Sequence, residues 1–505
     1  MKTRFIRHIS RFNQHSDFMK KSYWSITLFQ TSTIGWLAGP ALLLLTILLP
    51  APEGMSVLAW RTAGIAMLLA IWWTTEVLPI PVTALLPIVL FPASGIMTTA
   101  QSCVPYATPI IFLLLGGFLI AMGLEKWNLH RRLALNLLIH TGSNPAIVLA
   151  GFMGITAFLS MWISNTASTL MMIPIALSLV SELTKTHEHD RFILSLVLGI
   201  AYSASIGGLG TLIGTPPNLL LAAFVKQTYG YEISFLDWML LGVPVVIVLL
   251  YLAWWVLHKW AYPVDASKTH LSQDSIANEL KQLGAVSIPE KRLAIVFILV
   301  AAAWILRVPF QQYFSVMLWL DDTLIAVAGA IAMFIIPAGD ASGKNGALMD
   351  WERTRNLPWG VLLLFGAGLS LANGIEKTGL ASWLGEYMSG ITMLPPLVMI
   401  AGLVILVIFM TELTSNTATT ATLLPVLAAL ALAGDMLTPM LLFAPATLAA
   451  SCAFMLPVAT APNAVVYATG NVTIAQMAST GFKLNLIAII AITTLTYWLV
   501  PVIFG

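Results

Sequence analysis

The tetrapeptide Ser164-Asn165-Thr166-Ala167 occurs a second time, 251 positions later, as Ser415-Asn416-Thr417-Ala418. Each copy lies near the middle of an apolar stretch, at about 145–180 and about 393–431, that is too long for a single membrane crossing. Polar groups in hydrocarbon are costly unless they pair with each other or bind something. The repeated motif therefore predicts a binding site assembled from the two halves of a transporter.

Composition indicates the class of protein in which this motif lies. The chain has 505 residues, of which 58% are hydrophobic and 9% are charged. Soluble domains carry about 25% charged residues, so an all-α polytopic membrane protein is expected. The net charge is +2 and the basic residues cluster in loops, which argues against a nucleic-acid partner. Residues 1–32 are expected to form a cytoplasmic tail and not a signal peptide, because Met1 to Lys21 have no apolar core.

Apolar runs of about 20 residues predict the membrane crossings. We expect about 11 transmembrane helices plus two re-entrant hairpins at 145–180 and 393–431. The expected spans are 33–50, 58–75, 80–97, 107–124, 192–225, 238–258, 291–309, 320–338, 358–375, 437–470 and 482–503.

The positions of charged residues predict the orientation of these segments. Lys and Arg residues flank 145–180 on both sides, so this hairpin is expected to enter from the cytoplasm. The flanks of 393–431 carry Glu386 and Asp435 without nearby basic residues, so the second hairpin is expected to enter from outside.

A central basic segment divides the chain into two membrane halves. Residues 259–290 are expected to form a cytoplasmic linker between a first half at 33–258 and a second half at 291–505. The N-terminus is then cytoplasmic and the C-terminus lies outside.

The duplication extends beyond the tetrapeptide. At the same offset of 251, Glu125-Lys126 matches Glu376-Lys377, and two glycines, an alanine and a proline also match. At an offset of 245, Gly214-Thr215-Pro216-Pro217-Asn218 matches Ala459-Thr460-Ala461-Pro462-Asn463. Two copies with opposite hairpin orientation predict an inverted-topology repeat, in which secondary transporters place their site near the midplane.

The chemistry of these motifs favours ions of both signs. A turn or a proline break frees backbone carbonyls, which together with Asn and Ser oxygens suit small hard cations. Helix N-termini carry partial positive charge and bind anions. The motifs contain no Asp, Glu, Lys or Arg. Bound cations would then balance an anionic solute, which couples the two binding events.

Other interpretations of the polar residues remain open at this point. Ser, Thr and Asn in membrane helices also serve only to pack helices together, which would fit a structural or receptor role. An intramembrane serine protease would need a base beside Ser164 or Ser415, and the histidines lie in the tail, in loops or at span ends. The run His187-Glu188-His189-Asp190 is interpreted as a solvated cytoplasmic turn and not as a metal cluster.

The chain resembles the divalent anion/sodium symporter family. The resemblance rests on both Ser-Asn-Thr motifs, on the run from Ala450 to Ala459, Ala-Ser-Cys-Ala-Phe-Met-Leu-Pro-Val-Ala, and on Asn463-Ala464-Val465-Val466. It implies a homodimer whose transport domain moves like an elevator against a static scaffold. It also implies a multi-pass protein of the bacterial inner membrane.

The same resemblance implies two symmetry-related sodium sites and a carboxylate site between them. The implied sodium ligands are Ser160, Ser164, Asn165, Gly214, Thr411, Ser415, Asn416 and Ala459. The implied substrate contacts are Asn165, Thr166, Ser415, Asn416, Thr417, Thr460 and Ala461. The internal repeat agrees, because Ser160 and Thr411 are 251 positions apart and Gly214 and Ala459 are 245 apart. Family members often have Pro where this chain has Ala461, which leaves the preferred substrate open.

The expected function is sodium-coupled uptake of dicarboxylates or tricarboxylates of the succinate, malate, fumarate or citrate class. The alternatives are a sodium-independent carboxylate exchanger and a carrier of sulfate or another inorganic oxyanion. No enzymatic activity, no metal other than sodium and no organic cofactor are expected.

Overall fold

The computed structural model describes residues 24–180, 187–263, 274–314, 317–339, 346–388, 394–434 and 438–505. The regular elements in these ranges are α-helices, joined by short 3₁₀ turns and one π turn. Eight of the described helical segments are long and apolar enough to cross a bilayer. The expected all-α polytopic membrane fold is confirmed.

The first half of the chain contains the helices that lead to the first Ser-Asn-Thr motif and follow it. They are α2 (Trp24–Leu48), α3 (Val57–Thr75), α4 (Ile80–Thr83), α5 (Leu86–Ala93), α6 (Thr99–Cys103), α7 (Pro109–Lys126), α8 (Leu129–Leu138), α9 (Pro145–Ser160), α10 (Asn165–Val180), α11 (His187–Gly207), α12 (Pro216–Tyr229) and α13 (Phe235–Trp255).

The second half begins with a short connecting helix, and its last seven helices follow the order of the last seven helices of the first half. Its elements are α14 (Asp274–Gln282), α15 (Ile288–Tyr313), α16 (Asp322–Ile335), α17 (Trp359–Thr378), α18 (Leu380–Met388), α19 (Pro396–Thr411), α20 (Asn416–Ala433), α21 (Met440–Ala450), α22 (Ala461–Ala468) and α23 (Ile474–Phe504).

Prolines and glycines divide three of the expected spans into shorter helices. The span at 80–97 is two helices, α4 and α5, each with Pro in its first turn, where the missing N–H is tolerated. The span at 192–225 is broken between α11 and α12, and the span at 437–470 is broken between α21 and α22. The run that begins at His187 was expected to be a turn, but the structure places it at the start of α11.

Both apolar stretches with a central Ser-Asn-Thr fold as helical hairpins. In the first, α9 ends at Ser160 and α10 begins at Asn165. In the second, α19 ends at Thr411 and α20 begins at Asn416. The polar motif therefore lies at the tip of each hairpin, as the sequence predicts.

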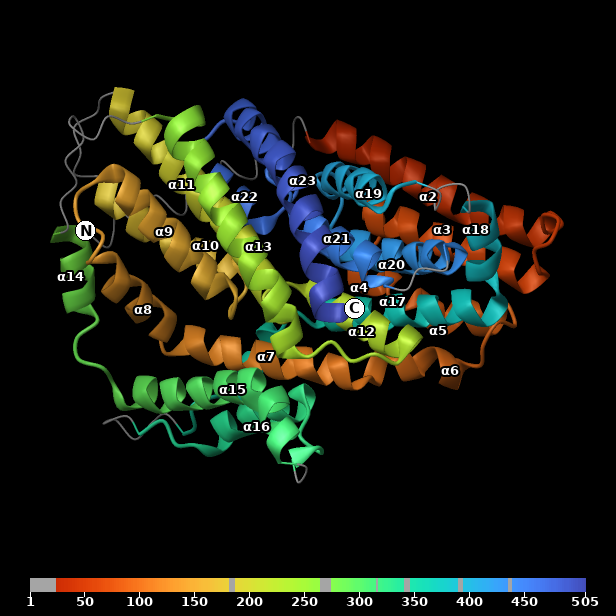
Figure 1. The fold of residues 1–505 in the computed structure, drawn as a ribbon, viewed down its shortest axis with the longest axis horizontal. Coiled ribbons are helices and arrows are strands. Elements are labelled where there is room, and N and C mark those ends of the chain that lie inside the picture. Colours follow the sequence, from red (N-terminus) through yellow and green to blue (C-terminus); the bar gives the residue numbers. More distant parts are fainter. Residues whose placement is uncertain are drawn as a thin grey trace.

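The arrangement of the helices brings the two halves together. In Figure 1, α9, α10 and α11 lie on one side, α2, α3, α18 and α20 lie on the other, and α13 and α23 cross between them. Helices α7, α15 and α16 run along the lower edge of the same view. Helices α13 and α23 pack against each other, as do α7 and α16.

Matched glycines allow these crossing helices to lie close to the broken segments. A Cβ at Gly242 of α13 would collide with the Leu209 carbonyl oxygen, and a Cβ at Gly481 of α23 would collide with the Phe454 carbonyl oxygen. Leu209 and Phe454 are themselves 245 positions apart, so both contacts follow the internal repeat. Only glycine permits such an approach of one backbone to another.

Candidate cation and substrate site

The first hairpin tip gathers oxygen atoms around one hydroxyl. Ser160, fully buried at the end of α9, places its Oγ 2.6 Å from Asn165 Oδ1 and 2.6 Å from the Ala204 carbonyl oxygen of α11. A hydroxyl has one proton and can donate it to only one of these acceptors at a time. The cluster therefore has an excess of acceptor oxygens, which suits a small hard cation.

The second hairpin tip repeats this geometry. Thr411, fully buried at the end of α19, places its Oγ1 2.8 Å from Asn416 Oδ1 and 2.6 Å from the Ala450 carbonyl oxygen of α21. The side chains of the two clusters come from equivalent positions, 251 apart, and the two carbonyl groups are 246 positions apart. The symmetry expected from the sequence is thus present in the side-chain contacts.

A buried asparagine holds each broken segment in a tight loop. Asn218 Nδ2 donates to the carbonyl oxygens of Gly208 (2.9 Å) and Thr211 (2.8 Å). In the second half, Asn463 Nδ2 donates to the carbonyl oxygens of Ala453 (3.1 Å) and Leu456 (3.0 Å), the equivalent positions. The Oδ1 atoms of both asparagines are buried and have no hydrogen-bond partner among the described residues. Each of these oxygens is free to accept a hydrogen bond or to coordinate a cation.

The first loop also approaches the first hairpin tip. A Cβ built on Gly208 would lie 2.8 Å from Asn165 Oδ1 and 3.2 Å from the Gly214 carbonyl oxygen. Three of the expected sodium ligands, Ser160, Asn165 and the backbone of Gly214, therefore converge in the structure. Gly208 is required there because any side chain would fill the space between them.

The remaining expected cation ligands, Ser164, Ser415 and Ala459, lie at helix starts or in the loop of the second broken segment. Ser164 is exposed and directly precedes α10, where its Oγ accepts a hydrogen bond from Ala167 N at 3.1 Å and caps the helix. Ser415 is the N-cap residue of α20, and Ala459 is buried in the loop between α21 and α22.

Four helix N-termini begin at the motif residues. Helices α10 and α20 start at Asn165 and Asn416, and α12 and α22 start at Pro216 and Ala461. The halves are interleaved, since α10 packs against α22 and α20 packs against α12. Helix N-termini carry partial positive charge, so this arrangement can attract an anion without Lys or Arg. Thr166, Thr417 and Thr460 lie in these first turns or at the N-cap.

Ala461 gives the second loop an N–H group that the first loop lacks. It is the first residue of α22 and is exposed, whereas the equivalent first residue of α12 is Pro216. We expect Ala461→Pro to fold normally, because Pro is favoured at the first position of a helix. The substitution removes one donor, and we expect it to weaken substrate binding by about 3- to 10-fold, as the loss of one hydrogen bond of about 1 kcal/mol implies. Isothermal titration with succinate in saturating sodium would measure the change, and unchanged affinity would exclude this N–H from the site.

Sequence reasoning missed a buried carboxylate beside the second motif. Glu412 directly follows α19, is 3% exposed, and accepts hydrogen bonds from the backbone N–H groups of Phe454 (2.7 Å), Met455 (2.9 Å) and Leu456 (3.2 Å). It also accepts from Asn485 Nδ2 of α23 at 2.8 Å. The motifs themselves contain no charged residue, and Glu412 lies just outside the second one. Its equivalent in the first half is Met161, so the internal repeat gave no signal for it.

Comparison with known sequences identifies the family. The sequence profile described as "Sodium:sulfate symporter transmembrane region" matches residues 30–504. The chain belongs to this family.

Curated relatives of this family match the chain along nearly its full length. A sodium-dependent dicarboxylate transporter, SdcS, of Staphylococcus saprophyticus is 43% identical over 479 residues, which cover 94% of this chain and 92% of the relative. SdcS of Staphylococcus aureus strain USA300 is 42% identical over 511 residues and covers 98% of both chains. The resemblance inferred from the motifs is confirmed.

Solved structures share the fold at low sequence identity. Neisseria gonorrhoeae MtrF aligns with a TM-score of 0.56 at 14% identity, covering 93% of this chain and 94% of that chain. The Alcanivorax borkumensis YdaH transporter aligns with a TM-score of 0.55 at 14% identity, covering 86% of this chain and 98% of that chain. Both support a helical membrane-transporter fold.

Proposed function

We propose that this protein is a secondary active transporter that takes up dicarboxylates, of the succinate, malate and fumarate class, together with sodium ions. The two matched oxygen clusters carry this proposal, because each combines a hydroxyl, an asparagine oxygen and a free carbonyl in a hairpin tip. The relatives named sodium-dependent dicarboxylate transporters agree with it. Citrate is the larger substrate that the same site could admit.

Charge balance gives the physical reason for coupling. A dicarboxylate brings two negative charges to a site whose fixed positive partners are helix N-termini only. One cation about 4 Å from a carboxylate contributes about 4 kcal/mol at an effective dielectric constant of about 20. That energy corresponds to almost a thousandfold in affinity. Binding of the anion is then weak until sodium is bound, and the buried charge of Glu412 strengthens this dependence.

The proposed mechanism moves the site as a unit. Both hairpin tips and both broken segments pack on one another, so they could travel together past a scaffold in an elevator-type cycle. We propose that the protein is a homodimer in the bacterial inner membrane, with a cytoplasmic N-terminus and an external C-terminus. No catalytic step is part of this mechanism.

Uptake into proteoliposomes tests the proposal. Radiolabelled succinate should accumulate under an inward sodium gradient and not when choline replaces sodium outside. Succinate accumulation that is indifferent to sodium would instead support a carboxylate exchanger.

The family profile also refers to sulfate, which the same experiment can address. Excess unlabelled fumarate or malate should inhibit succinate uptake, citrate should inhibit less, and sulfate should not inhibit. Inhibition by sulfate together with failure of succinate to accumulate would favour an inorganic oxyanion carrier.

A further inference from the structure

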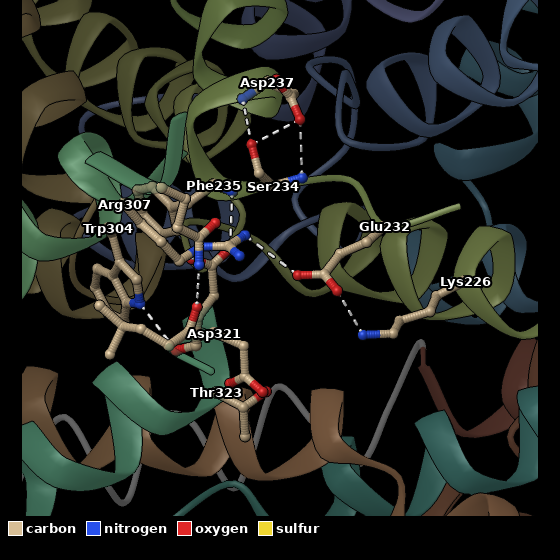
Figure 2. A network of polar contacts seen from close by, with 12 residues as sticks. Lys226, Glu232, Ser234, Phe235, Asp237, Trp304, Arg307, Asp321 and Thr323 are labelled. Carbon is tan, nitrogen blue, oxygen red and sulfur yellow. Dashed lines mark hydrogen bonds and ion pairs between the residues drawn. The ribbon is translucent and has the colours of Figure 1, made fainter. Parts of the chain in front are cut away.

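A network of charged groups joins the start of α13 to the hairpin formed by α15 and α16. Arg307 of α15 is buried, and its Nε lies 2.8 Å from Asp322 Oδ1 while its Nη2 lies 3.3 Å from Asp322 Oδ2. The same Nη2 lies 3.2 Å from Glu232 Oε1 in the segment between α12 and α13. Figure 2 shows Arg307 on one side of Glu232 and Lys226 on the other, where Lys226 Nζ lies 2.7 Å from Glu232 Oε2.

Asp322 connects the two parts a second time through the backbone. Its Oδ2 accepts a hydrogen bond from Phe235 N at 2.9 Å, which is the first N–H of α13. A carboxylate at a helix N-terminus is stabilised by the helix dipole. Its carbonyl oxygen also accepts from Trp304 Nε1 of α15 at 3.0 Å. The start of α13 is therefore held by two charged groups that belong to another pair of helices.

Aromatic stacking extends this contact to the first hairpin tip. Phe235 stacks on Trp304 with ring centroids 4.6 Å apart and an interplanar angle of 9°. Phe235 also stacks on Trp162, with ring centroids 6.1 Å apart, and Trp162 in turn contacts Phe297 of α15 edge to face at 5.2 Å. Trp162 lies two residues before Ser164, so this stacking connects the start of α13 to the loop that carries the proposed cation site.

The network lies at the end of α15 farthest from the 259–290 segment. Arg307 is 19 residues beyond Ile288, which corresponds to about 28 Å along the helix. That length is close to the thickness of the hydrocarbon core, about 30 Å. The contact is thus at the opposite membrane face from the start of α15.

We propose that Arg307 and Asp322 form a latch that fastens Glu232 and the start of α13 to the α15–α16 hairpin in this conformation, and that the latch opens in each transport cycle. The inference rests on the proposed transport function, in which the hairpin tips move past a scaffold. It makes α15 and α16 part of that scaffold. The latch then controls the distribution between conformations and not the affinity for sodium or substrate.

The charge state of Glu232 supports a contact that persists at neutral pH. Burial raises the pKa of its carboxyl, but the nearby Lys226 and Arg307 outweigh burial and hold the pKa below its ordinary value. Glu232 is nevertheless 40% exposed, whereas Arg307 and Asp322 are 8% and 7% exposed in their side chains. The two connections therefore differ in strength, with the exposed pair the weaker.

Distance measurement between spin labels tests the latch directly. Labels at Leu240→Cys of α13 and Tyr313→Cys of α15, both exposed positions, would report the separation of the two parts in full-length protein in proteoliposomes. Cys103→Ser removes the exposed native thiol, and Cys452 is buried. In the labelled protein without further substitutions, we expect one population with the shorter label-to-label distance, which is the distance in the latched conformation.

Three carboxylate substitutions distinguish loss of the latch from the general effect of removing a negative charge near the start of α13. We expect Asp322→Asn to lower the ratio of short to long distances at least about 10-fold, and Glu232→Gln to lower it about 2- to 5-fold. Asp237→Asn is the matched control, because this carboxylate lies in the first turn of α13 but bonds to Ser234 of its own helix end. It should leave the ratio unchanged.

Transport assays supply a second measurement, in which the maximal uptake rate is compared with the half-saturating concentrations of sodium and succinate. Glu232→Gln should change the maximal uptake rate while leaving the half-saturating sodium and succinate concentrations within about 2-fold. If neither Glu232→Gln nor Asp322→Asn shifts the distance ratio, the latch is refuted, whatever the transported solute. If Asp322→Asn does not fold, Glu232→Gln decides the question. Failure of sodium-driven uptake in the unmodified protein would refute the proposed function and leave the distance result to be judged separately.

Discussion

Glu412→Ala should abolish sodium-driven uptake, reducing the initial rate at least about 100-fold. The carboxylate accepts hydrogen bonds from three consecutive backbone N–H groups, those of Phe454, Met455 and Leu456, and from Asn485. Without an acceptor, each buried donor costs on the order of 1–3 kcal/mol. The loop between α21 and α22 would lose the shape that presents its carbonyl oxygens to the second cation position.

Glu412→Gln distinguishes the shape of this loop from its charge. Glutamine keeps one acceptor oxygen but turns an NH₂ group toward backbone donors, so part of the network is lost. We expect residual uptake with a half-saturating sodium concentration raised about 10-fold or more, because the negative charge near the second cation is also lost. Glu376→Gln, at an exposed position near the end of α17, is the matched control and should behave like the unmodified protein. Normal sodium dependence of a folded Glu412→Gln protein would contradict this role.

The hairpins and the two oxygen clusters at their tips could be predicted because the signal for them is local and is repeated. A Ser-Asn-Thr run inside an uncharged stretch has few explanations, and the second copy at constant offset shows that the first is not accidental. The offset also pairs Ser160 with Thr411, whose equivalent contacts the structure reveals.

Contacts between distant parts of the chain had no such signal. Glu412 lies three residues before Ser415 of the second motif, but its partners lie 42 to 73 positions away, and Met161 occupies the equivalent place in the first half. The pairing of Arg307 with Asp322 and Glu232 was likewise hidden, because a basic residue near a span end is typical of a membrane boundary. The prolines in 80–97 did indicate a broken helix, but a single span was expected there because the number of apolar residues was enough for one crossing.

The symmetry of the two clusters predicts that loss of either asparagine stops coupled transport. Asn165→Ala and Asn416→Ala each remove an oxygen that lies within 2.8 Å of a buried hydroxyl and faces the proposed cation. A hydrogen bond or ligand contact to a charged group contributes about 1.5–3 kcal/mol, which corresponds to about 10- to 150-fold in sodium affinity. At ordinary external sodium, each variant should show uptake at or near background.

Substitutions of the Thr411 hydroxyl should weaken sodium binding by smaller, graded amounts than the asparagine substitutions. Thr411→Val keeps the size of the side chain but removes the hydroxyl, and we expect it to raise the half-saturating sodium concentration about 10-fold. Thr411→Ser keeps the hydroxyl, matches the natural Ser160 of the first half, and should stay within about 3-fold of the unmodified protein. Sodium-dependent thermal stabilisation measures binding without transport, and it should fall in the order Thr411→Ser, Thr411→Val, Asn416→Ala. Equal stabilisation of all three by sodium would place the cation elsewhere, since each variant removes a different share of the same oxygen cluster.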